Sequence, residues 1–264
     1  MRTLRPLVQG RRVRRVLVRH GVAVRPQTGA SLHRRVAGTH ICGAERRGKY
    51  LLLMLDRGCL AIHFKFDGQL LWFDDPRVAL ARDLHVDVAL ETESGTLGFV
   101  DPRHLGRVIW LAQPDDSAGI KALGVDAFSE QFSLARLVGL CKLRPRPLKL
   151  LLMDQTRIAG IGNMYANELL WGARLHPLKS SDLLYPSEFR RLHKAVVSVL
   201  ARALEYCLHP PPDFRDPQWW FTGLEKMFRV YGREGEPCRR CGSEIRRIEQ
   251  GGRSIYFCAA CQRL

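Results

Sequence analysis

Residues 238–261 read CRRCGSEIRRIEQGGRSIYFCAAC, and they set the architecture of the C-terminal part of this chain. Two Cys-x-x-Cys pairs, Cys238 with Cys241 and Cys258 with Cys261, are separated by sixteen residues. This spacing predicts four thiolates around one structural Zn²⁺ ion, because each pair supplies two ligands from one tight turn. Two disulfides or a redox-active pair are the alternatives, and neither suits a cytosolic chain without a βαβ unit.

Between the cysteine pairs, residues 246–257 alternate around Gly251-Gly252 and predict a β-hairpin. The hairpin carries Arg253 near its exposed tip. At that position Arg253 is equally compatible with a solvated surface side chain and with a contact to a phosphate. The last 27 residues are too few to form a hydrophobic core, so the module depends on its metal for stability.

Upstream of this module the apolar residues follow a helical period. Residues 148–155 and 163–173 predict two helices joined by the glycine-rich turn TRIAGIG. A longer helix is predicted from Ser187, its N-cap, to the proline run that starts at Pro210. Its predicted buried face consists of Phe189, Leu192, Val196, Val199, Leu200, Ala203, Leu204 and Cys207.

The N-terminal part of the chain predicts β-structure instead. Short apolar or alternating runs occupy residues 50–55, 59–66, 69–73, 85–90, 96–101 and 107–112. Turn residues separate them, and such regular short spacing favours an antiparallel sandwich or barrel over βαβ units.

The net charge of +16 and the pI near 10.0 point to a polyanionic partner. The basic excess is distributed along the chain, as expected of a protein that contacts many nucleic-acid phosphates. Ribosome-associated and some membrane-surface proteins share this trait. No run is long enough to span a membrane and no secretory signal is evident, so we expect a soluble cytoplasmic protein. The remaining cysteines are expected to be reduced core residues: Cys42, Cys59, Cys141 and Cys207.

Seven motifs follow one another along the chain: RRGKYLLLML (46–55), IHFKFDGQL (62–70), HVD (85–87), FVDPRHLG (99–106), MDQTRIAGIGNMYANELLWGARLHP (153–177), VYGREGEPCRRCG (230–242) and GGRSIYFCAACQ (251–262). In this order they resemble the motifs of the formamidopyrimidine-DNA glycosylases, the base-excision repair family to which endonuclease VIII is related. The resemblance spans about Leu4 to Gln262. It implies an α+β multidomain fold: an antiparallel β-sandwich over residues 1–122, a helix-two-turn-helix domain over 123–229 and a zinc-finger hairpin over 230–264.

The resemblance also implies the partner and the site residues. A monomer would hold double-stranded DNA with oxidised bases or abasic sites in the cleft between the first two domains. Lys49 matches the family's lysine near the reacting sugar, and His85 lies in a DNA-contacting motif. Asn163 and Arg253 match residues that bind phosphates. Without the resemblance, Lys49 is an ordinary exposed lysine and Asn163 a simple N-cap.

Three further residues match the wedge that fills the duplex when the damaged nucleotide flips out. Phe66, His104 and Leu105 stand where many members of the family carry methionine, arginine and phenylalanine. Because the family's arginine contacts the orphaned base, His104 leaves the opposite-base preference open. Phe66 and Leu105 taken alone are also compatible with core positions.

The family's nucleophile is an N-terminal proline followed by glutamate, and this pair is not found in the opening MRTLRPLV. The proline amine attacks C1′ of the damaged nucleoside, and elimination then breaks the strand. Alignment places Met1 about nine residues inside the family's N-terminus, with residues 1–8 as the back half of a helix. We favour a start upstream of Met1 over a truncated helix or a lineage that has lost its nucleophile. Lys49 is a substitute amine for abasic sites.

The loop PPPDFRDPQWWF (210–221) departs from the family as well. Pro212 replaces a basic residue near the flipped base, and Trp219 and Trp220 either stack on a base or pack against the finger.

The sequence therefore predicts a glycosylase and abasic lyase for oxidised purines whose proline nucleophile is missing from the chain. The alternatives are a non-catalytic or lyase-only binder of damaged DNA, and an endonuclease VIII-like enzyme for oxidised pyrimidines. A ribosome-associated zinc ribbon explains the charge and the cysteines but not the ordered motifs.

Overall fold

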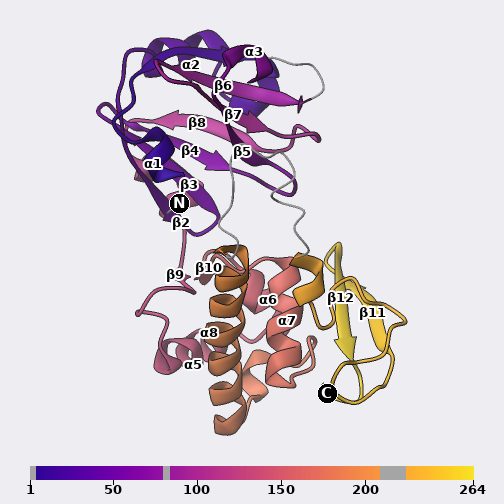
Figure 1. The fold of residues 1–264 in the computed structure, drawn as a ribbon. Helices are drawn as coiled ribbons and strands as arrows, with labels where there is room; N and C mark the ends of the chain where they lie inside the picture. Colours follow the sequence, from indigo (N-terminus) through magenta and orange to yellow (C-terminus); the bar gives the residue numbers. More distant parts are fainter. Residues whose placement is uncertain (1–3, 80–83, 209–223) are drawn as a thin grey trace. The chain divides into compact units, whose positions relative to one another are not determined.

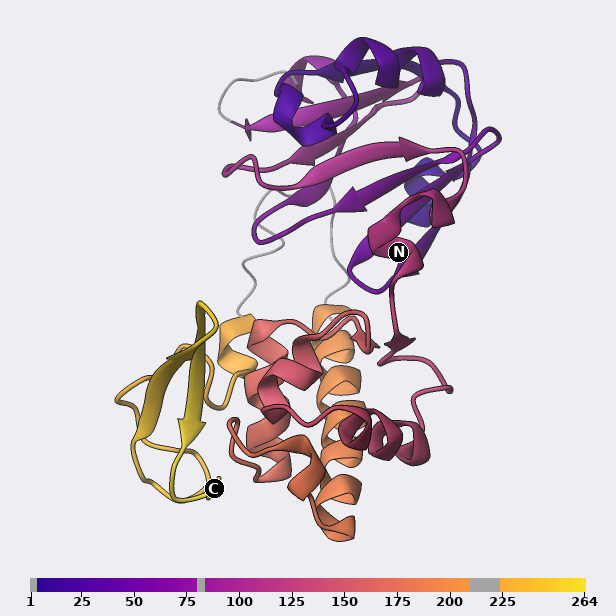
Figure 2. The ribbon, with the colours of Figure 1, turned by 180° about the vertical axis from the view of Figure 1, so that it is seen from behind.

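The computed structural model describes residues 4–79, 84–208 and 224–264, and Figures 1 and 2 show its ribbon from two sides. The described residues form two compact units, with the division between Lys121 and Ala122. The predicted limits of three domains, at residues 122/123 and 229/230, stay predictions.

The first unit is a sandwich of two four-stranded antiparallel sheets. One sheet has the order β1-β6-β7-β5, formed by β1 (Val13–Val18), β5 (Gln69–Phe73), β6 (Val86–Thr92) and β7 (Thr96–Val100). The other has the order β2-β3-β4-β8, formed by β2 (Ile41–Arg47), β3 (Tyr50–Leu55), β4 (Cys59–His63) and β8 (Arg107–Leu111). Side chains of both sheets, such as Val16, Leu53 and Phe99, share one buried core. The predicted antiparallel sandwich is confirmed.

Short helices accompany the sheets of this unit: α1 (Arg5–Val8), η1 (Gly21–Val24), α2 (Gly29–Val36), α3 (Pro76–Ala79), η3 (Pro114–Asp116) and α4 (Ala118–Lys121). In the described residues, the helix expected over residues 1–8 is the single turn α1. Leu4 and Val8 are both buried in the sandwich core and hold this turn in place.

The second unit is built around four α-helices: α5 (Leu134–Leu143), α6 (Leu148–Met153), α7 (Asn163–Ala173) and α8 (Pro186–Leu208). The predicted turn between α6 and α7 contains β10 (Ile158–Ala159), which pairs in parallel with β9 (Val125–Asp126). The short helices η4 (Ser181–Leu183) and η6 (Leu224–Met227) complete the unit. One face of α8 is buried as predicted from Phe189 to Ala203, but Leu204 is 47% exposed and Cys207 is exposed. The prediction was wrong for these two residues, because the described core ends at Ala203.

The C-terminal hairpin belongs to the same unit and consists of β11 (Ile245–Gln250) and β12 (Arg253–Cys258). Gln250 pairs with Arg253, so Gly251 and Gly252 alone form the turn. Their φ angles of +57° and +68° belong to a mirror-image turn that glycine adopts without strain.

Two further expectations can be compared with the described residues. None of their helices combines the length and apolar character that crossing a bilayer requires. Of the four scattered cysteines, Cys59 and Cys141 are buried as expected, whereas Cys42 and Cys207 are exposed. The expectation of four core cysteines was therefore wrong for two, since Cys42 projects from the outer face of β2.

Candidate nucleic-acid interface and metal centre

The four cysteines of the finger meet as the sequence predicts. Their sulfur atoms all lie within 4.8 Å of one another, and three of the separations are 3.4, 3.5 and 4.0 Å. A tetrahedral Zn²⁺ with bonds of about 2.3 Å requires sulfurs about 3.8 Å apart, so the arrangement fits one ion. A disulfide would need about 2.05 Å, which excludes the first alternative.

Donors around Cys238 and Cys241 favour the thiolate form that binds the metal. The Trp171 indole N–H donates to Cys238 Sγ at 3.4 Å, and the Arg240 amide donates to the same sulfur at 3.5 Å. Hydrogen bonds from Ser243 lead the effects that lower the pKa of Cys241 to about 6. This set of donors supports a closed structural zinc site without a position for a reacting water.

Asn163 is the first residue of α7, and the structure changes its expected role. The N-cap is Gly162, and no side chain caps this end, so the simple N-cap interpretation of Asn163 is wrong. Its Oδ1 atom is buried and has no hydrogen-bond partner in the described part of the chain. The first-turn amides of α7 also lack helical partners, so this end presents donors that suit an anion.

The glycine-rich turn before Asn163 is held in place by one side chain. The Gln155 amide accepts from Gly160 N at 3.0 Å and donates to Ile161 O at 2.8 Å. Gly160 has a φ of +98°, which an L side chain rarely adopts. The backbone of this turn is therefore fixed where it leads into α7.

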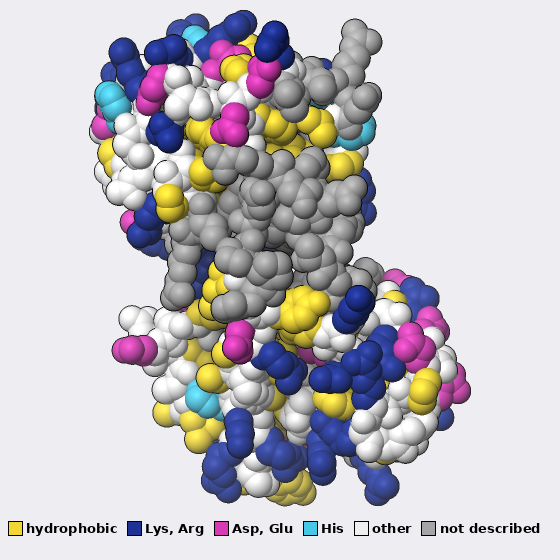
Figure 3. Space-filling view, in the orientation of Figure 1, with side chains coloured by type: hydrophobic (Ala, Val, Ile, Leu, Met, Phe, Trp, Pro, Cys, Tyr) yellow, Lys and Arg dark blue, Asp and Glu magenta, His cyan; other side chains and the backbone are white. Residues whose placement is uncertain are grey.

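Arg253 is exposed at the start of β12, and hydrogen bonds connect its strand to Asn163. Asn167 is buried; its Nδ2 donates to Asn163 O at 2.8 Å, while its Oδ1 accepts from Tyr256 N at 3.0 Å. The structure thus joins both predicted phosphate-binding residues through one helix, α7. Figure 3 shows Lys and Arg side chains gathered where this unit's helices and hairpin lie.

Lys149 is a buried residue of this network that no sequence motif picks out. It is 1% exposed on α6, and its Nζ donates to Ser254 O at 2.5 Å. Burial first, and then the charge of Arg253, lowers the pKa of Lys149 to about 8. The only sequence signal is a single lysine inside the apolar run LKLLLM.

A second buried charged residue, Glu168 of α7, attaches the finger to that helix. The Glu168 carboxylate accepts from the backbone amides of Arg229, Val230 and Tyr231, each at 2.9 Å. Three amide donors satisfy a buried carboxylate without a cation. Glu168 therefore fixes the segment that leads into the zinc site.

Lys49 lies in the first unit, in the two-residue turn between β2 and β3, after Gly48 with a φ of +55°. Lys49 is half-buried rather than fully exposed. Burial first, then Lys65 and Lys49, lowers the pKa of His63 to about 4. Because His63 is neutral and the ammonium groups of Lys49 and Lys65 lie near it, the turn between β2 and β3 carries a net positive charge.

The predicted wedge residues are found in two settings. Phe66 is 55% exposed and Leu105 is 42% exposed, so the core interpretation of these residues is wrong. The Arg103 guanidinium lies 4.8 Å from the centre of the Phe66 ring and forms an ion pair with Asp67. Arg103 was not among the predicted site residues, yet it is the cation stacked on the exposed aromatic ring.

His104 is held differently from its neighbours. Its Nδ1 lies 2.7 Å from Asp87 Oδ1, and its ring stacks on His20 at 3.9 Å. Insertion of His104 into a duplex would break both contacts. His85, the other predicted DNA-contacting histidine, is exposed and lies edge-on to His104 at 6.2 Å.

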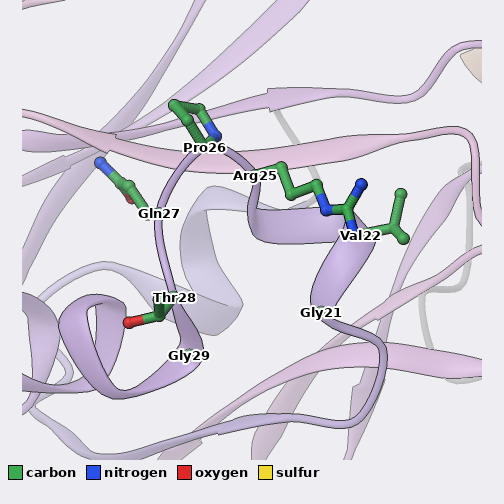
Figure 4. Close-up of a pocket in the computed structure, with 7 residues that line it drawn as sticks. All are labelled: Gly21, Val22, Arg25, Pro26, Gln27, Thr28 and Gly29. Atoms are coloured by element: carbon green, nitrogen blue, oxygen red, sulfur yellow. The ribbon is translucent and has the colours of Figure 1, made fainter.

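A pocket in the first unit has few side chains that could take part in catalysis. The pocket in Figure 4 has a volume of about 480 Å³, and among the residues that line it Arg25 is the charged one. The Gln27 amide is engaged by the backbone of Trp110. This pocket therefore holds no set of acid and base groups. Met1, Pro212, Trp219 and Trp220, which entered the sequence predictions, lie outside the described residues.

Comparisons with known proteins agree with this organisation. Three family models match: the formamidopyrimidine-DNA glycosylase N-terminal domain over residues 1–108, its H2TH domain over 123–208, and the zinc finger found in FPG and IleRS over 235–264. The formamidopyrimidine-DNA glycosylase of Syntrophotalea carbinolica is 37% identical over 263 residues, which cover 99% of this chain and 96% of the relative. That of Acidovorax sp. is 39% identical over 86% of this chain and 84% of the relative.

Solved structures match over the same length. MutM (Fpg) of Thermus thermophilus has a TM-score of 0.83 at 35% identity, covering 99% of this chain and 95% of the other. Lactococcus lactis Fpg in complex with DNA containing an abasic site has a TM-score of 0.87 at 26% identity, covering 100% and 96%. On these matches, which extend through both units and the zinc finger, the chain belongs to the formamidopyrimidine-DNA glycosylase family.

Proposed function

We propose that this chain is a glycosylase and abasic lyase for oxidised purines, formamidopyrimidine and 8-oxoguanine, in double-stranded DNA. Its own groups bind the lesion duplex and cleave the abasic strand, and the proline that removes the base in the family is not found in the printed sequence. The observation that carries the proposal is the hydrogen-bonded network that joins Asn163 to the strand of Arg253 through Asn167. Lactococcus lactis Fpg has been solved with DNA containing Fapy-dG, and MutM with carbocyclic 8-oxo-G, which supports this lesion class.

The second unit supplies the grip on phosphates. The α7 N-terminus with Asn163 offers amide donors, and Arg253 offers a planar pair of donors for a phosphate oxygen. Lys149 adds a positive charge behind Arg253. Two anchors on one rigid network would hold the backbone of the damaged strand on both sides of a flipped nucleotide.

The first unit supplies the wedge and the groups near the sugar. We assign the wedge to Phe66, Arg103 and Leu105, because these side chains are exposed whereas His104 is engaged with Asp87. The guanidinium of Arg103 has donors for the orphaned base, and Phe66 provides a stacking face. Lys49 and His85 would lie along the sugar-phosphate chain.

The nucleophile of the family is a proline that is followed by glutamate. None of the prolines in the printed sequence is followed by glutamate. We propose that Lys49, after its ammonium group has released a proton to water, can form an imine with C1′ of a pre-formed abasic sugar and release water. The neighbouring positive charge of Lys65 and the neutral His63 would favour this loss of the proton. Elimination would then expel the 3′ phosphate. Base removal would need the secondary amine of an added Pro-Glu opening.

A borohydride trapping assay tests these statements. The chain as printed, and a version preceded by a Pro-Glu opening of the family type, are incubated with duplexes that contain 8-oxoguanine, formamidopyrimidine, an oxidised pyrimidine or an abasic site. Lys49→Ala is compared with Lys121→Ala, a matched exposed lysine of the same unit. We expect the extended version to trap and nick the purine lesions and the printed chain to trap the abasic site alone.

Each alternative has its own outcome. Loss of abasic trapping in Lys49→Ala but not in Lys121→Ala supports the lysine imine. Preference for the oxidised pyrimidine would transfer the proposal to the endonuclease VIII class. If both versions bind lesion duplexes tightly and neither traps, the chain is a damage-binding protein and the enzymatic proposal fails.

A further inference from the structure

A second cluster of metal-binding side chains lies in the first unit, apart from the cysteines. His20 follows β1, Asp87 lies in β6, and His104 lies between β7 and β8. One ligand atom from each lies within 4.8 Å of the other two. Within the described residues, this group and the four cysteines are the two sets with such spacing.

Within the described residues, two buried polar atoms of this cluster have no hydrogen-bond partner. Asp87 is 1% exposed; its Oδ1 meets His104, but its Oδ2 makes no hydrogen bond. The Nδ1 atom of His20 is also buried and unpartnered. Buried polar groups in folded proteins are nearly always satisfied, so each exception calls for a physical explanation. Both orphaned atoms belong to the same three-residue group.

Neighbouring groups do not supply the missing partner. The neighbouring Asp101 already accepts from the backbone amides of Arg103 and Gly106, and because it is an acceptor it could not satisfy Asp87 Oδ2. Burial, the largest effect, raises the pKa of Asp87, and the hydrogen bond from His104 opposes it. The carboxylate thus lies in a place that disfavours a bare negative charge and would be stabilised by a cation.

We propose that His20, Asp87 and His104 together bind one divalent transition-metal ion such as Zn²⁺. Two imidazoles and one carboxylate form a donor set typical of such ions, and the remaining positions would be filled by water. Tetrahedral coordination at about 2.1 Å needs ligand atoms about 3.4 Å apart. The ligand atoms of this cluster lie within 4.8 Å of one another, so rotation of the side chains, including the stacked rings of His20 and His104, would bring them to one ion. The His104 side chain is 35% exposed, which gives an ion access from solvent.

The ion would act on the DNA-reading loop. His104 lies between Arg103 and Leu105, so binding would tie this loop to β1 and β6. The role is structural and distinct from the zinc of the finger, which lies in the other unit. Without the ion, Arg103 and Leu105 would be positioned only by the contacts of their own side chains.

An ordinary histidine–aspartate pair in the same unit provides the matched control. His40 Nδ1 lies 3.3 Å from Asp56 Oδ2, but their side chains are 52% and 40% exposed. This pair has no second histidine and no buried orphaned atom in the described part of the chain. It therefore shares the residue types without the enclosed arrangement.

The test adds Co²⁺ to the full chain whose cysteine site is already loaded with Zn²⁺. We expect one further equivalent of Co²⁺ whose spectrum lacks a thiolate-to-metal band. Paramagnetic broadening should reach the ring signals of His20 and His104 before that of His40. His20→Asn and His104→Gln should each weaken this binding at least tenfold, whereas His40→Gln should retain it.

Three results would overturn the proposal. Wild-type chain that binds no further equivalent lacks the site. Binding that survives in both variants, or that broadens His40 as strongly, reports an adventitious surface ion only. The ring signals of the wild-type chain decide the matter even where a variant fails to fold.

Discussion

Arg253 is an exposed guanidinium on a strand fixed by buried neighbours, so its contribution to binding can be isolated. We expect Arg253→Ala to weaken binding to abasic-site duplex about 10- to 100-fold, since charge-assisted hydrogen bonds are worth about 1.5–3 kcal/mol. Fluorescence anisotropy measures the affinity. Arg246→Ala, an exposed arginine of the same hairpin, is the control and should change the affinity little. Equal losses in both would mean that total charge, not position, matters.

Lys149 has a pKa of about 8 in the folded chain, below its ordinary value of 10.5. Between these values the unfolded chain holds the proton and the folded chain releases it. The contribution of this group to the free energy of unfolding therefore rises with pH across that window. We expect the wild type to gain stability relative to Lys149→Met from pH 7 to pH 10 in thermal melting. A pH-independent difference would contradict the lowered pKa.

Single residues also show what the sequence could and could not predict. The cluster of four cysteines followed from their spacing. The roles of Asn163 and Arg253, which come from the resemblance, stay predictions. Lys149 could not be found, because its partner Ser254 lies 105 residues further along the chain. Exposure of Phe66 and engagement of His104 with Asp87 depend on loop conformations that apolar periodicity does not encode.

At the scale of elements, α7 carries the finger through Glu168. We expect Glu168→Gln to destabilise the second unit by about 2–4 kcal/mol, because an amide group would face three backbone N–H donors that now meet a carboxylate. Thermal melting and the rate of zinc loss to a chelator measure the effect. Glu249→Gln, an exposed change on β11, should leave both unchanged. Faster zinc loss in the control as well would contradict the role of Glu168.

The elements themselves were largely predictable. Short strands with regular turns predicted the sandwich, and the helical period predicted α6, α7 and α8 close to their observed bounds. The prediction of Ser187 as an N-cap was wrong, because α8 begins at Pro186. The end of the buried face of α8 was not predictable, since Leu204 and Cys207 continue the period beyond the described core. A period shows which residues share a face but not how far the neighbouring core extends.

For the whole molecule, the charge of +16 predicts strongly salt-dependent binding. Release of counterions from 6–10 phosphates lowers affinity by about 10³- to 10⁵-fold between 50 and 200 mM salt. We expect the binding of undamaged duplex to fall within this range. Anisotropy titrations at several salt concentrations measure the slope. A slope that matches one or two phosphates would mean that most of the basic residues lie away from DNA.

The attachment of the finger to α7 has a consequence for biosynthesis. Asn167, Glu168 and Trp171 leave the ribosome well before the residues from Arg229 onward that satisfy them. Because domains fold during synthesis from the N-terminal side, a nascent chain exposes these polar groups until the residues from Arg229 onward have been made. Until the finger has folded around its metal, these three side chains of α7 lack their partners, so we expect a chain deprived of zinc to expose them to solvent.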